Sequence, residues 1–140
     1  SLATPRRNVV GWDSSRLAML TAVLEARCGV PLSGRDIFLN VAGGLKISET
    51  AADLAVAAAL ISSVTGRPAP KRTVFFGEVA LSAELRQVAQ SDSRLKEAAK
   101  LGFDNAVMPR PRKASAKHVD INLSQPPTLA DLIDIMGGMD

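Results

Sequence analysis

The stretch of sequence that decides the fold is Gly43-Gly44-Leu45-Lys46-Ile47-Ser48-Glu49-Thr50-Ala51-Ala52-Asp53-Leu54. It joins a glycine turn to a polar segment that leads into an apolar one. Two side chains are suited to cap a helix here: Ser48, or Thr50 with Asp53 three residues later, the spacing of a capping box. The stretch therefore predicts a helix that begins at one of these two positions.

The expected helix continues through the most apolar part of the chain. No polar residue occurs over 54–61, so we expect protein to surround this helix on every side. Gly66 suits the left-handed residue that follows a helix, and Pro68 prevents its continuation. We expect it to bury its large apolar side chains, which are Leu54, Val56, Leu60, Ile61 and Val64.

Length and composition favour one ordinary domain over residues 1–140, with an aliphatic core. The chain has 46% hydrophobic and only 4% aromatic residues. Few aromatic residues argue against a base-stacking platform for single strands. The longest apolar run, about eight residues, is far shorter than the ~20 that span a bilayer, so we expect no membrane segment. The start at Ser1 suggests a domain of a longer protein.

Hydrophobic periodicity and turn residues predict alternating helices and strands. We expect helices over 13–27, 50–65, 91–101 and 128–136, the third capped by Ser91 or Ser93 and the last by Thr128. Strands are expected over 36–42, 73–81, 104–108 and 118–123, with 83–88 returning as a hairpin arm. Residues 8–12 form either a short strand or an arm that adds to one. Gly77 inside the 73–81 run indicates a bulge or a close approach. This pattern predicts an α+β fold, an α/β sandwich in which helices pack on a mixed sheet.

The net charge of +3 is unevenly distributed. Two groups of cations stand out, and they are Arg110, Arg112, Lys113 and Lys117, and Arg67, Lys71 and Arg72. Such groups favour phosphate-bearing partners, although solvated loop charges would look the same.

Motifs of nucleotide hydrolysis and of metal binding are absent from the sequence. Neither glycine pair is followed by the pattern of a phosphate-binding loop, and no Gly-x-Ser-x-Gly elbow occurs. The single histidine, His118, is expected on the exposed face of a strand. The single cysteine, Cys28, continues the apolar stripe of the 13–27 helix, so we expect it to be a core residue. Because one cysteine cannot form an internal disulfide, we expect the protein in a reducing, cytoplasmic compartment.

Several motifs resemble, in order, the C-terminal domain of the RadA (Sms) family of bacterial DNA repair proteins. They are residues 40–57, Gly77-Glu78-Val79, Glu84-Leu85-Arg86, residues 94–103 and Ala106-Val107-Met108-Pro109. The resemblance covers roughly residues 7–135. It implies a domain similar in fold to the Lon proteolytic domain, taken from a DNA-dependent ATPase that acts on branched DNA.

The same resemblance implies the partners and cofactors. In the family this domain follows a zinc finger and a RecA-like ATPase core, both absent from these 140 residues. We therefore expect no cofactor here, and ATP, Mg and Zn only in the missing parts. The family further implies a homohexameric ring that binds DNA without sequence preference, with a recombinase as a further possible partner.

The likeness to Lon also places a serine–lysine dyad. When the Lon pattern is laid on this chain without gaps, the nucleophile position falls on Ala51 and the lysine position on Asp92. Neither residue can perform the reaction, which needs a hydroxyl and a neutral amine. Thr50 is rotated by about 100° on a helix and cannot replace the nucleophile.

These observations favour a noncatalytic DNA-binding and ring-forming domain. We expect phosphate contacts from the group Arg110, Arg112, Lys113 and Lys117, with Lys46 and Arg86 as further candidates. The alternatives are a purely structural hexamerisation scaffold, a module that docks another ring protein or a recombinase, and a residual serine peptidase.

Overall fold

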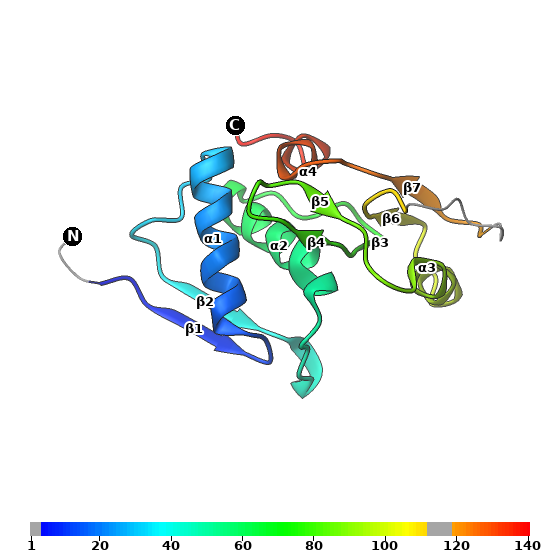
Figure 1. Ribbon diagram of the computed structural model, residues 1–140, viewed down its shortest axis with the longest axis horizontal. Helices are drawn as coiled ribbons and strands as arrows, with labels where there is room; N and C mark the ends of the chain where they lie inside the picture. The colour runs from blue at the N-terminus through cyan, green and yellow to red at the C-terminus, as the bar shows by residue number, and fades with distance from the viewer. Residues whose placement is uncertain (1–3, 112–118) are drawn as a thin grey trace.

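The computed structural model describes residues 4–111 and 119–140 of the chain (Figure 1). In chain order its elements are β1 (Arg7–Val10), α1 (Ser14–Cys28), β2 (Ile37–Asn40), η1 (Ala42–Gly44), η2 (Thr50–Ala52), α2 (Asp53–Thr65), β3 (Thr73–Phe75), β4 (Glu78–Val79), β5 (Leu85–Arg86), α3 (Ser91–Lys100), β6 (Asn105–Val107), β7 (Asn122–Ser124) and α4 (Leu129–Ile135). The two η elements are single turns of 3₁₀ helix.

The strands of the described residues form three small sheets. Strands β1 and β2 are parallel, β3, β6 and β7 form a parallel sheet in the order β3-β6-β7, and β4 and β5 are an antiparallel hairpin. Helix α2 lies near the centre, α1 packs against it, and α4 contacts both (Figure 1). The predicted α+β sandwich and the predicted hairpin are confirmed, although the sheet is divided.

Helix α1 follows its prediction closely. The Asp13 carboxylate accepts a hydrogen bond from the Ser15 amide at 2.8 Å, which satisfies one free amide of the first turn. Gly29 ends the helix in the left-handed region, with φ of 69°. The apolar stripe of this helix faces the core, since Leu17, Leu20, Val23 and Leu24 are all buried.

The predicted caps of α2 are wrong. Neither Ser48 nor Thr50 makes a capping bond, and the helix proper begins only at Asp53, after the turn η2. The carbonyl oxygen of Gly77 accepts from the Leu54 amide at 3.1 Å instead. The first turn of α2 is therefore satisfied by a distant segment, and not by its own side chains.

The expectation that protein surrounds α2 is also only partly met. Leu54, Leu60 and Ile61 are buried as predicted, whereas Val56 and Val64 are half-buried. The small residues Ala55 and Ala59 are exposed. One stripe of the helix therefore reaches solvent, and the apolar run did not show it because alanine is tolerated on either side of a helix.

The predicted strand over 73–81 is two strands in different sheets. Strand β3 pairs with β6, and β4 pairs with β5. Gly77 lies between them with φ of 153°, and a Cβ atom there would stand 2.7 Å from the ring of Pro109. The close approach predicted from Gly77 is thus confirmed, and it interrupts the strand.

The later elements match their predictions in part. Helix α3 begins after Gln90, which has φ of 63°, and the predicted caps by Ser91 and Ser93 are wrong. Helix α4 is capped as predicted, since Thr128 Oγ1 accepts from the Asp131 amide at 3.3 Å. Met136, after its last residue, is buried as predicted.

The strand predicted over 118–123 is shorter and shifted. It begins at Asn122, because the Ile121 amide donates to the Val119 carbonyl and turns the chain just before it. Leu123, in the middle of β7, is 50% exposed. His118 lies outside the described residues.

Two buried clusters hold the elements together. The larger one combines side chains of α1, α2 and α4, including Leu20, Leu54 and Leu132. The smaller one joins α3 to β6 through Phe76, Leu95, Ala106 and Met108. Because α3 packs through this separate cluster, the turn before it stands at the edge of the molecule (Figure 1).

Candidate functional site

The two positions implied by the Lon likeness lie at the starts of two helices. Ala51 belongs to η2, just before α2, and is 5% exposed. Its carbonyl oxygen accepts from the Gly77 amide at 2.9 Å, while Gly77 in turn caps α2. Two backbone hydrogen bonds therefore join Gly77 to the start of α2. Ala51 contributes no reactive side chain.

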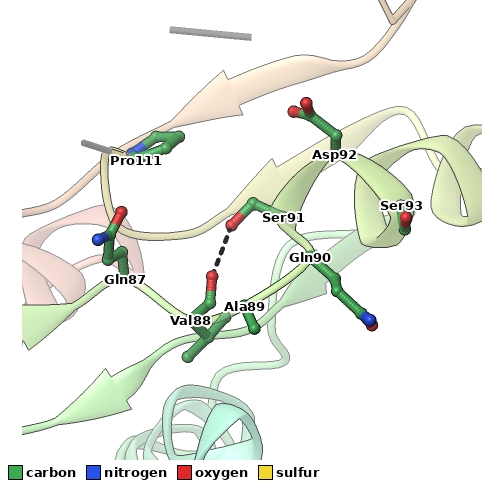
Figure 2. A pocket seen from close by; sticks show the side chains of 8 residues that line it. All are labelled: Gln87, Val88, Ala89, Gln90, Ser91, Asp92, Ser93 and Pro111. Carbon is green, nitrogen blue, oxygen red and sulfur yellow. Dashed lines mark hydrogen bonds between the residues drawn. The ribbon is translucent and has the colours of Figure 1, made fainter. Parts of the chain in front are cut away.

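Asp92 lies in the first turn of α3 and is exposed. A groove of about 530 Å³ runs beside it, between the 87–90 segment and Pro111. Figure 2 shows that Ser91 points to Val88, and its hydroxyl donates to the Val88 carbonyl at 3.2 Å. Among the described residues that line this groove, no lysine accompanies the Ser91 hydroxyl or the Asp92 carboxylate.

An ion pair joins the two helix starts. Arg94 of α3 binds Glu49, which precedes η2, with 2.6 Å between Nη2 and Oε2. The Arg94 guanidinium also stands over the ring of Phe76 at 5.9 Å. Glu49 is two residues before Ala51 and Arg94 is two residues after Asp92, so this pair links the segments that carry the two positions.

A buried carboxylate, that of Asp53, lies at the start of α2. The side chain of Asp53 is fully buried, and it accepts from Arg16 Nε at 2.8 Å and from the Val79 amide at 3.0 Å. A further bond runs from Arg16 Nη2 to its second oxygen. The bond to Asp53 raises the pKa of Arg16, so the guanidinium stays charged and ties α1 and β4 to the start of α2.

Some of the predicted DNA-binding residues lie outside the part of the chain that the structure describes. Arg112, Lys113 and Lys117 are not among the described residues, whereas Lys46, Arg86 and Arg110 are, and all three are exposed.

Lys46, Arg86 and Arg110 do not form one cluster in the chain. Arg86 and Arg110 each precede a residue that lines the groove beside Asp92. Lys46 lies in the loop after η1. Among the described residues, none of the three forms an ion pair.

The second basic group is largely engaged in structural contacts. Arg67 donates from Nη1 to the Asp140 carbonyl at 2.5 Å, and Arg72 pairs with Asp104. Their hydrogen bond lowers the pKa of the Asp104 carboxyl and raises that of Arg72. Of this group only Arg72 forms an ion pair within residues 4–111 and 119–140.

The described residues hold no group of three side chains that could bind a metal ion. Cys28 is half-buried against the large core cluster, and burial raises the pKa of its thiol. A raised pKa keeps the thiol protonated and unreactive, which agrees with the predicted core role.

The comparison with known proteins supplies the family. A family model described as subunit ChlI of Mg-chelatase matches residues 13–112. The chain belongs to this family. It is also 53% identical over 133 residues to the DNA repair protein RadA of Brucella abortus, with 95% of this chain covered. RadA of Rickettsia felis is 52% identical over 107 residues, and RadA of Pseudomonas aeruginosa is 51% identical over 118.

These relatives confirm the predicted resemblance to RadA. The chain spans about a quarter of their length, since the matches cover 28%, 24% and 26% of the three proteins. The likeness to the Lon proteolytic domain stays a prediction. In the described part of the chain, every helix is too short or too polar to cross a membrane.

Proposed function

We propose that this chain is a noncatalytic DNA-binding and ring-forming domain of a RadA-type DNA repair protein. The observation that carries the proposal is the identity of about half of its residues to RadA proteins over nearly the whole chain. The proposed parent is an ATP-dependent protein that acts on branched DNA. ATP, Mg and Zn would bind in its other domains.

The candidate site supports a role without peptide cleavage. The position matching a Lon-type nucleophile is Ala51, which has no hydroxyl, and the position matching the lysine is Asp92, which carries the opposite charge. The Glu49–Arg94 ion pair joins the segment before Ala51 to the helix that carries Asp92. These features favour a scaffold that is kept for its shape.

The distribution of charge supports DNA as the partner. Arg110 is exposed without an ion pair to any described residue, and Arg112, Lys113 and Lys117 follow it in the sequence. Four contacts to duplex phosphates would give a slope of about −3.6 for log affinity against log salt concentration, at roughly 0.9 per contact. Such contacts would read no sequence.

The test is fluorescence anisotropy of labelled duplex and branched DNA across salt, with light scattering on the same samples. We expect Arg110→Glu to weaken binding and to reduce the slope by about one unit. The matched control is Arg27→Glu, which makes the same change at an exposed position in the last turn of α1. Equal affinity and slope for Arg110→Glu and the unsubstituted chain would refute this placement.

A purely structural ring scaffold, or a docking module for a recombinase, is the second candidate. It is favoured if the chain assembles in light scattering yet retains no DNA at low salt.

A further inference from the structure

Strand β2 has a free edge. Within the described residues it pairs with β1 alone, and the amides of Ile37 and Val41 donate to carbonyl oxygens of Arg6 and Val10 at 2.8 and 2.9 Å. Alternate residues of a strand direct their backbone groups to opposite edges. The intervening residues 38 and 40 therefore turn their N–H and C=O groups away from β1, as a template for another strand.

A groove lies along the same strand. It has a volume of about 320 Å³ and separates β2 and the preceding loop from one side of α2. We call it the edge groove, and its α2 wall consists of Ala59, Leu60, Ser63 and Val64. Phe38, on the opposite wall, is 61% exposed. Its lining residues are mostly apolar, and together with the free backbone groups of β2 they suit an extended chain with alternating side chains.

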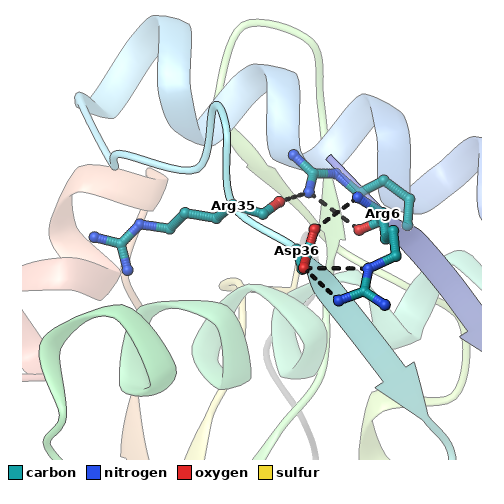
Figure 3. Close-up of polar contacts among 4 residues, drawn as sticks. Arg6, Arg35 and Asp36 are labelled. Carbon is teal, nitrogen blue, oxygen red and sulfur yellow. Dashed lines mark hydrogen bonds and ion pairs between the residues drawn. The ribbon is translucent and has the colours of Figure 1, made fainter. Parts of the chain in front are cut away.

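One end of the edge groove carries an uncompensated positive charge. Asp36 is held by Arg6 through bonds of 2.8, 3.3 and 3.0 Å, and in Figure 3 the Arg35 side chain points away from this pair. Arg35 lines the groove, and its guanidinium forms no ion pair with the described residues. It is available to a carboxylate of an incoming segment.

We propose that the edge groove binds an extended, acidic peptide segment of a partner protein, which adds as a strand to β2. The backbone of the segment pairs with Phe38 and Asn40, its apolar side chains face α2, and its carboxylate meets Arg35. A second copy of this chain is the less suitable occupant, because each copy carries a net charge of +3. The proposal is independent of DNA binding and of ring formation.

The probe is a fluorescein-labelled hexapeptide of alternating valine and threonine that ends in aspartate. One twin peptide carries N-methyl groups on the amides that would donate to β2, and another carries lysine in place of the aspartate. We expect saturable binding of the probe and a loss of about tenfold or more for the methylated twin, which lacks the backbone donors. The amides of Phe38 and Asn40 should become protected from hydrogen exchange when the probe binds.

Two pairs of variants locate the site. Ala55 and Ala59 are both exposed on α2, and only Ala59 lines the groove. Ala59→Glu should reduce binding several-fold by repelling the acidic probe, whereas Ala55→Glu should not. Arg35→Glu should reverse the preference in favour of the lysine twin, and Arg27→Glu should leave it unchanged.

Three results would overturn the proposal. These are no saturable binding of the probe, equal binding of the methylated twin, and unchanged exchange at Phe38 and Asn40. Protection of these amides that rises with protein concentration, without any peptide, would assign the edge to a second copy instead. DNA binding by the same samples is measured separately, so the two proposals fail independently.

Discussion

Replacement of the buried Asp53 by alanine should destabilise the fold strongly. The carboxylate is fully buried and accepts bonds from Arg16 and from the Val79 amide. Breaking a buried ion pair costs about 3–5 kcal/mol, and a buried amide left without an acceptor costs about 1–3 kcal/mol. The Arg16 side chain is 25% exposed and can recover hydration, which places the total near the lower end, at about 3 kcal/mol.

This magnitude is large enough to measure without ambiguity. For a domain of this size it corresponds to a fall in Tm of roughly 10 °C. Urea unfolding followed by circular dichroism gives the free energy of unfolding. Arg16→Ala should cost a similar amount, and the double variant should cost less than the sum, because either single change already abolishes the pair.

The exposed Arg6–Asp36 pair provides the control. Both side chains are largely in water, and such pairs contribute little to stability. Asp36→Ala should therefore shift the unfolding midpoint far less than Asp53→Ala. Equal shifts for the two variants would refute the assignment of Asp53 as the residue that ties α1 and β4 to the start of α2.

Two further predictions concern Gly77 and Asp36. Gly77→Ala should lower the free energy of unfolding by about 2 kcal/mol, because its Cβ would clash with Pro109 at 2.7 Å; an unchanged urea midpoint would contradict this. Hydrogen bonds from Arg6 hold the pKa of the Asp36 carboxyl below its ordinary 3.8, so its contribution to stability is present above that pH and is lost as the pH falls through the lowered pKa. The free energy of unfolding of Asp36→Asn, measured from pH 2 to 7, should therefore fall less below about pH 4 than that of the unsubstituted chain. An equal fall for the two proteins would argue against this role of Asp36.

The parts of the fold that the sequence predicts well are those governed by neighbours along the chain. Helix α1 lies within one residue of the predicted range and is capped by Asp13, and α4 is capped by Thr128, since a cap and its amide lie within three residues. The same rules failed for α2. Its cap is the carbonyl of Gly77, which is more than twenty residues away and is brought there by tertiary structure.

The same distinction applies to the candidate site. Ala51 and Asp92 could be singled out through the resemblance to Lon, because that comparison is made residue by residue. The Glu49–Arg94 pair could not, since its partners are 45 residues apart. Asp53 was expected to serve its own helix as half of a capping box, and only the arrangement of α1 and β4 around it reveals its bonds to Arg16 and Val79.

The environment of the two dyad positions argues further for a scaffold without peptidase chemistry. A lysine that acts as a general base must be desolvated, so that its pKa falls far enough for a neutral amine at physiological pH. Asp92 stands exposed at the start of α3, and an amine placed there would be hydrated and remain protonated. Ala51 is buried and its carbonyl oxygen is bonded to the Gly77 amide, so a hydroxyl there would face packed protein. The surroundings of both positions, and not their side chains alone, therefore support the proposed noncatalytic role.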